Sequence, residues 1–246
     1  MIKIENVSVH GFKEAIRGMR NPMNSWEKSD TLFIRSDFTD DIDELNLAEK
    51  CGGYMPLIRD NDLDLMKRLA KAGTDHRKFM RMIVVYADVT APLYWWKEAD
   101  TYKVGTVRNS CSTMHKITEK EFTLDDFSHD RLLVVEKLET IINWLNEYRD
   151  IYVNWDKNRR FGRYLDSNGV ELNKKDIWYQ IIQLLPSSYN QRATLMLNYE
   201  VLANMYHSRK AHKLDEWRDF CKWIETLPYS ELITGGVENA SNNITE

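Results

Sequence analysis

The sequence predicts an α/β fold in which strands and helices are mixed along the chain. Residues 80–90 read MRMIVVYADVT, a β-branched run typical of a strand, and Ile2, Ile4, Val7 and Val9 alternate with one slip, as in a strand with a bulge. Several other segments place apolar residues three and four positions apart, which is the period of an amphipathic helix. A length of 246 residues suffices for one substantial core.

The composition is that of an ordinary globular protein and limits the function classes. Hydrophobic residues make up 43% and charged residues 29%, and the net charge of -4 leaves no nucleic-acid footprint over the chain as a whole. Cys51, Cys111 and Cys221 are odd in number and lack zinc-site spacing, so we predict no metal site and a reducing compartment. Because no apolar run is long enough for a signal peptide or a membrane span, we expect a cytoplasmic protein.

A short helix, an acidic segment and a longer helix should follow the first strand. Residues 14–20 (EAIRGMR) carry apolar positions at helical spacing, and Asn21-Pro22 should end that helix. Residues 27–61 hold a cluster of acidic side chains and two adjacent glycines without an EF-hand pattern, which indicates a mobile polar connection that could serve as a lid. Residues 61–73 (NDLDLMKRLAKAG) start with capping residues and end at a glycine, as a helix does.

The second half of the chain reads as helices and one hairpin. A capping box begins a helical stripe over residues 123–148, and the basic residues 156–175 surround an Asn-Gly turn, which favours a hairpin insertion. Three further helices are predicted, over residues 176–185, 190–208 and 213–227. We expect a single domain over residues 1–230 and a flexible polar tail over residues 231–246.

The predicted helix over residues 190–208 has a face that suits a nucleotide. Asn198, Leu202, Met205 and Arg209 are spaced by four, three and four residues, so they share one side of a helix. An amide at one end could contact a base, and a cation at the other end could contact a phosphate. A pure core stripe would need neither.

Residues 91–115 (APLYWWKEADTYKVGTVRNSCSTMH) are the part of the chain best suited to binding. Aromatic, charged and small hydroxyl side chains follow one another without a hydrophobic period, directly after a predicted strand. Binding groups often lie where a strand ends. In the alternative interpretation, Tyr94, Trp95 and Trp96 fill a core and the charged residues around them are solvated.

Two segments resemble the flavin-dependent thymidylate synthases. Residues 69–115 run LAKAGTDHRKF, MIVVYADV and Ala-Pro before the central motif, in the order and spacing of that family's signature region. Residues 185–217 are similar to the family's C-terminal pattern, whose positions are matched by Arg192, Asn198, Asn204 and Arg209.

The central motif departs from the family pattern. The family's Arg-His-Arg falls on Thr101, Tyr102 and Lys103, its upstream Gln on Glu98, and its Glu-x-Ser-x-Arg on Asn109, Cys111 and Thr113. The lost cations are donors worth about 1.5 to 3 kcal/mol each to a charged partner. Either the ligand has changed, or other cations compensate, with Arg17, Arg20, Lys97, Arg108 and Lys116 as candidates.

The resemblance implies an activity and a set of site residues. The implied fold is a mixed sheet packed with long helices, assembled as a homotetramer. Reduced FAD would deliver hydride to dUMP or a related pyrimidine nucleotide after one-carbon transfer from methylenetetrahydrofolate, with NADPH as a further co-substrate. The implied cofactor-binding residues are His76, Thr101, Tyr102, Lys103, Asn109, Asn198 and Asn204. The implied substrate-binding residues are Glu98, Ser110, Cys111, Ser112, Thr113, Arg192 and Arg209.

Several alternatives stay open. His76, at a helix-to-strand junction, could be purely structural, and Cys111 as a nucleophile would need an adjacent base that the sequence does not show. A non-catalytic relative could keep the fold and bind a nucleotide or a partner chain without flavin chemistry, which the replaced motif favours. The basic hairpin at residues 156–175 could touch nucleic acid, but a solvated insertion suits an acidic protein better, so we expect no nucleic-acid partner.

Overall fold

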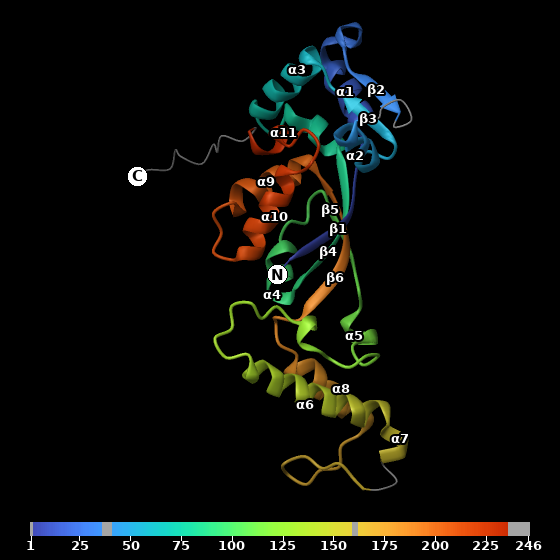
Figure 1. Cartoon of the computed structure of the whole chain (residues 1–246), viewed down its shortest axis with the longest axis vertical. Helices are drawn as coiled ribbons and strands as arrows, with labels where there is room; N and C mark the ends of the chain where they lie inside the picture. The colour runs from blue at the N-terminus through green and yellow to red at the C-terminus, as the bar shows by residue number, and fades with distance from the viewer. Residues whose placement is uncertain (1, 36–40, 159–161, 236–246) are drawn as a thin grey trace, which may run out of the picture. The chain divides into compact units, whose positions relative to one another are not determined.

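The chain combines sheets and helices, which confirms the predicted α/β class. A computed structural model describes residues 2–35, 41–158 and 162–235 (Figure 1). Two compact units can be separated within it. The helical unit comprises Thr90–Lys97 and Ser110–Arg192, and the sheet unit comprises Ile2–Val89, Glu98–Asn109 and the described part of Ala193–Glu246.

The larger sheet has four strands in the order β1-β4-β6-β5. They are β1 (Lys3–His10), β4 (Val84–Pro92), β5 (Thr106–Ser110) and β6 (Asn190–Asn198). Both predicted strands are therefore confirmed, and the slip in the alternation of β1 coincides with Asn6, whose φ of 51° is left-handed. Alternate residues of β4 and β6 are buried, as expected where a strand places one face on a core.

Helices from both ends of the chain build the rest of the sheet unit. The N-terminal α1 (Phe12–Arg20) and α3 (Asp60–Lys71) confirm two predictions. Further helices of this unit are the 3₁₀ helix η4 (Arg77–Met82), α9 (Tyr199–Arg209), α10 (Asp215–Glu225) and α11 (Glu231–Thr234). Tyr199 joins these parts, because its N–H donates to Ile83 O at 3.0 Å and its fully buried hydroxyl donates to Pro228 O.

The described residues between 27 and 61 form regular structure, so the expectation of a mobile polar connection was wrong. β2 (Leu32–Arg35) and β3 (Tyr54–Leu57) pair antiparallel, and α2 (Ile42–Lys50) lies between them in sequence. The acidic residues start this helix, since the Asp41 carboxylate accepts hydrogen bonds from the N–H groups of Asp43 and Glu44 at 2.9 and 3.2 Å. Asp37 and Asp40 lie outside the described residues.

The helical unit is built around α6 (Glu136–Val153) and α8 (Lys174–Leu184). Its core contains Ile117, Phe122, Phe127, Leu138, Ile142, Leu145 and Ile181. The predicted capping box is present, but it starts only a 3₁₀ turn, and α6 begins later than expected. The chain leaves the helical path because Phe127 pairs with Tyr189 in an antiparallel bridge.

The predicted tight turn is present in residues 156–175. Gly169 has a φ of 78°, the Asp166 N–H donates to Val170 O at 2.9 Å, and Leu165 and Glu171 form an antiparallel bridge. Residues 159–161 lie outside the part of the chain that the structure describes. The range expected as a tail begins with α11, which buries Leu232 and Ile233 completely, and residues 236–246 are not described.

The predicted helix over residues 190–208 was wrong in its first half. Gln191, Ala193, Leu195 and Leu197 are buried alternately in β6, and α9 starts only at Tyr199. Leu, Met and Ala are good helix formers, so their helical propensity hid the period of two in the sequence. In the structure, strand pairing overrides this propensity. Leu202, Met205 and Arg209 lie within α9 at the predicted spacing, and Asn198 is its N-cap residue, so the two polar groups stand at the two ends of this helix.

Candidate functional site

Glu98 and Arg209 form the centre of a polar cluster in the sheet unit. Arg209 Nη1 donates to Glu98 Oε2 at 2.7 Å, and Arg209 Nε donates to the Tyr102 hydroxyl at 2.9 Å. Trp217 Nε1 donates to the same Glu98 oxygen at 3.0 Å, and His212 Nε2 lies 3.4 Å from it. The structure thus brings three predicted site residues together in this group of five, which we call the Glu98 cluster.

Two aromatic rings hold the Arg209 guanidinium. Its central carbon lies 4.8 Å from the centroid of the Trp217 ring and 5.6 Å from that of Tyr102. Trp217 is fully buried and the Arg209 side chain is 19% exposed. A guanidinium that is both stacked and hydrogen-bonded is fixed in orientation. Among the described residues, neither Arg209 Nη2 nor Glu98 Oε1 has a hydrogen-bond partner.

Local sequence explains how the cluster assembles. Glu98 lies in the last turn of α4 (Leu93–Ala99), where the N–H and the hydroxyl of Thr101 donate to Glu98 O at 3.1 and 2.7 Å and turn the chain towards Tyr102. Gly105 then has a φ of 77°, and a Cβ there would lie 2.4 Å from Asn198 Nδ2. Only glycine lets this loop pass so close to the start of α9.

A second polar group, the Glu200 group, links η4 to α9. Glu200 is 8% exposed and accepts hydrogen bonds from Arg77 Nε at 3.2 Å, from Arg81 Nη2 at 3.2 Å and from Arg81 Nε. Arg77 Nη2 donates to Asn204 Oδ1 at 3.5 Å. The hydrogen bond from Arg81 to Glu200 raises the pKa of Arg81. Two guanidinium groups share the Glu200 carboxylate, and the Asp75 carboxylate also interacts electrostatically with Arg81.

The other predicted cofactor residues of the sheet unit have simple surroundings. His76 is exposed and directly precedes Arg77, so it borders the Glu200 group. Asn198 Oδ1 accepts from the Val201 N–H at 2.9 Å and caps α9. Lys103 and Asn109 are exposed.

The remaining predicted substrate residues lie in the helical unit. The Cys111 N–H donates to Arg192 O at 2.9 Å, and Ser112 Oγ accepts from His115 N at 3.2 Å to cap α5 (Thr113–Lys116). Ser110, Cys111 and Arg192 are exposed. Trp95 and Trp96 are almost fully buried and meet edge to face at 4.9 Å, so the core interpretation is confirmed for these two side chains.

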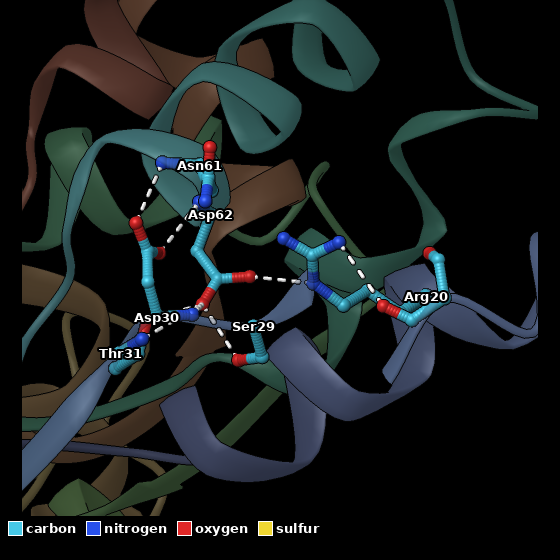
Figure 2. Close-up of polar contacts among 7 residues, drawn as sticks. Arg20, Ser29, Asp30, Thr31, Asn61 and Asp62 are labelled. Atoms are coloured by element: carbon cyan, nitrogen blue, oxygen red, sulfur yellow. Dashed lines mark hydrogen bonds and ion pairs between the residues drawn. The ribbon is translucent and has the colours of Figure 1, made fainter. Parts of the chain in front are cut away.

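Arg20, a candidate phosphate ligand, is committed to a buried ion pair (Figure 2). Its Nε donates to Asp62 Oδ1 at 2.7 Å, and the two side chains are 4% and 0% exposed. Asp62 Oδ2 accepts from Ser29 Oγ at 2.7 Å and from Thr31 Oγ1 at 2.6 Å. Burial raises the pKa of Asp62, but hydrogen bonds from Thr31, Ser29 and Arg20 outweigh it and hold this pKa below its ordinary value. Arg20 is therefore structural.

Two other candidate cations are also paired. Arg108 Nη1 donates to both carboxylate oxygens of Asp100, at 2.8 and 2.7 Å, and Lys116 pairs with Glu119. Arg17 and Lys97 are exposed.

The cysteines differ sharply in environment. Burial raises the pKa of Cys51 to about 12 and that of Cys221 to about 11, so both thiols are protonated at neutral pH. Cys111 is exposed. In the described part of the chain, no three His, Cys, Asp or Glu side chains are grouped as a metal site, and no helix is long and apolar enough to span a membrane.

Sequence reasoning missed Trp217, His212, Arg77 and Glu200. Trp217 was assigned only to an apolar stripe, although a buried indole N–H needs an acceptor and so indicates a polar partner. Glu200 beside the apolar positions of residues 197–203 carried a similar signal, since buried carboxylates are paired.

Comparisons with known proteins agree with this geometry at the level of the fold. No family model matches the sequence, and no curated protein matches it. The chain is similar to the solved thymidylate synthase X (ThyX) of Helicobacter pylori with FAD and dUMP, with a TM-score of 0.60 and 13% identity over 97% of this chain and 99% of that chain. A second structure of flavin-dependent thymidylate synthase ThyX from Helicobacter pylori, complexed with FAD and dUMP, gives a TM-score of 0.55 and 14% identity over 96% and 99% of the two chains. At these identities the likeness shows the fold alone.

Proposed function

We propose that this protein is a flavin-dependent thymidylate synthase-like enzyme that adds one carbon to dUMP or a related pyrimidine nucleotide. The observation that carries the proposal is the Glu98–Arg209 pair, which is held rigidly by Tyr102 and Trp217. Its support from comparison is the fold shared with enzymes solved with FAD and dUMP.

The Glu98–Arg209 pair complements the edge of a uracil ring. That edge presents carbonyl, N–H and carbonyl in a row, while the pair, joined through Arg209 Nη1 and Glu98 Oε2, offers the donors of Arg209 Nη2 and the acceptor Glu98 Oε1. Arg209 would donate to a ring carbonyl and Glu98 would accept from the ring N–H. A phosphate suits this place less well than we expected for Arg209, because the Glu98 carboxylate compensates the guanidinium charge and repels an anion.

Cations for anionic groups lie elsewhere in the sheet unit. Lys103 follows Tyr102 directly and is exposed, so we assign it to the nucleotide phosphate. The two guanidinium groups of the Glu200 group, with His76 and Asn204, are the donors that we assign to the pyrophosphate of a flavin nucleotide. When bound, the reduced flavin supplies the hydride, and methylenetetrahydrofolate and NADPH are the proposed sources of carbon and reducing equivalents. Roles for Thr101, Asn109, Asn198, Arg192 and residues 110–113 stay predictions, as do a homotetramer and a cytoplasmic location.

The test is a visible absorption spectrum of the purified protein with FAD, followed by titration with dUMP. We expect a bound flavin whose spectrum shifts with dUMP, and an Arg209→Met variant that keeps the flavin but needs at least about tenfold more dUMP. Arg108→Met is the matched control, because Arg108 is 18% exposed and also pairs with a carboxylate. A protein that holds no FAD would contradict the enzyme proposal.

A non-catalytic nucleotide-binding relative is the second candidate. It is favoured by the 101–103 triplet, in which Lys103 is the single cation. This candidate predicts dUMP binding that depends on Arg209 while FAD is not retained.

A further inference from the structure

A cavity of about 440 Å³ lies in the sheet unit beside the junction of β1 and α1. Cavities that hold small ligands commonly measure about 300 to 1,000 Å³. Its lining comes from the end of β1, the first turn of α1, Cys51 and one face of the β2–β3 pair. None of these elements contributes to the Glu98 cluster or the Glu200 group.

One wall of this cavity is an aromatic face of the small sheet. Phe33 and Pro56 are direct partners in the β2–β3 pair, and Tyr54 is two residues from Pro56, so all three lie on the same face. Phe33 is 36% exposed and Tyr54 is 52% exposed, whereas Phe12, which also lines the cavity, is buried. Two open rings on one wall form a platform on which a planar ring can stack.

The rim carries one charge of each sign and an imidazole. Lys13 and Glu14 both line the cavity and are exposed, and neither is paired within the described part of the chain. His10 is held in place, because its ring meets Tyr86 at 6.1 Å and a Cβ on Gly52 would approach it to 3.0 Å. A ring with N–H donors along its edge suits Glu14, and an acidic group on the same ligand suits Lys13.

We propose that this cavity binds a planar heteroaromatic ring that carries N–H donors and one acidic group, of the size of a nucleoside monophosphate. The ring stacks against Phe33 and Tyr54, Glu14 accepts a hydrogen bond from the ring edge, and Lys13 pairs with the acidic group. This site is separate from the Glu98 cluster and does not depend on the function proposed above.

The probe for the test is 2-aminopurine riboside 5′-monophosphate, whose fluorescence is quenched when the base stacks on an aromatic ring. Saturable quenching by the full chain is expected, and Phe33→Ala and Tyr54→Ala should each weaken binding about tenfold. Lys13→Gln should weaken binding of the monophosphate and leave binding of the unphosphorylated riboside unchanged. The matched controls are Tyr179→Ala, which removes a ring that is 42% exposed on α8, and Lys78→Gln, which removes another exposed lysine.

Phe33 and Tyr54 are exposed, so we expect their alanine variants to fold. Urea unfolding midpoints close to that of the unchanged protein would confirm this. No saturable quenching at millimolar probe would overturn the proposal, as would equal affinity in Phe33→Ala, Tyr54→Ala and the unchanged protein. Binding that is lost in Arg209→Met and kept in Phe33→Ala would place the probe in the Glu98 cluster and also overturn it.

Discussion

Replacing Glu98 by alanine tests whether this carboxylate organises the cluster around it. The change removes the acceptor of a charge-assisted hydrogen bond from Arg209, worth about 1.5 to 3 kcal/mol, and leaves the buried Trp217 N–H without its acceptor, at about 1 to 3 kcal/mol. The Glu98 side chain is 35% exposed, so water replaces part of what is lost. We therefore expect the free energy of unfolding to fall by about 2 kcal/mol and not by the full sum.

Urea unfolding followed by tryptophan fluorescence measures this change. Asp100→Ala is the matched control, because Asp100 follows α4 closely and pairs with Arg108 while its side chain is 54% exposed, so its loss should cost less than about 0.5 kcal/mol. Glu98→Gln keeps an oxygen acceptor for Trp217 and should cost about half as much as Glu98→Ala. A Glu98→Ala protein no less stable than the Asp100→Ala protein would show that Glu98 does not organise the cluster.

Two substitutions and one labelling experiment probe other parts of the structure. Asp62→Asn breaks a fully buried ion pair and should lower the free energy of unfolding in urea by about 3 kcal/mol. The folded pKa of Asp62 lies below 3.8, so the stability that this carboxylate contributes is complete above that pH and is lost as the pH falls through the folded pKa. Acid titration of the unchanged protein measures this loss. Gly105→Ala should destabilise more than Gly169→Ala, because both glycines have positive φ but only at Gly105 would a Cβ collide with a neighbour; equal costs would contradict that contact. Iodoacetamide at neutral pH should label Cys111 alone in the folded protein, and mass spectrometry that found the other thiols labelled equally fast would disprove the burial argument.

Strong periodicity let the sequence predict much of the fold, and its failures have physical causes. β1 and α3 follow from patterns of two and of three to four, and Gly73 and Pro22 mark the ends of helices. Residues 190–198 misled because their helix-forming side chains are buried alternately through strand pairing, which local propensity does not contain. The acidic residues around Asp41 misled because charge suggested solvation where it serves as a helix cap.

The candidate site was only partly predictable. Glu98, Tyr102 and Arg209 were singled out through a family resemblance, and the structure brings them together. Their dependence on Trp217 was hidden, since helical spacing shows that a tryptophan is buried but not which distant acceptor its N–H reaches. The sequence likewise did not show that Glu98 compensates the charge of Arg209. This compensation changes the expected ligand of Arg209 from a phosphate to the edge of a ring.

Recognition of uracil by the Glu98–Arg209 pair can be tested through the relative affinity of the FAD-supplemented protein for dUMP and dCMP, measured by isothermal titration calorimetry. Cytosine has no N–H at the ring nitrogen that would face Glu98 Oε1. We therefore predict that dUMP binds at least about tenfold more tightly than dCMP and that Glu98→Gln narrows this difference in affinity. Equal affinity for the two nucleotides, or a preference that survives Arg209→Met, would contradict recognition by the Glu98–Arg209 pair.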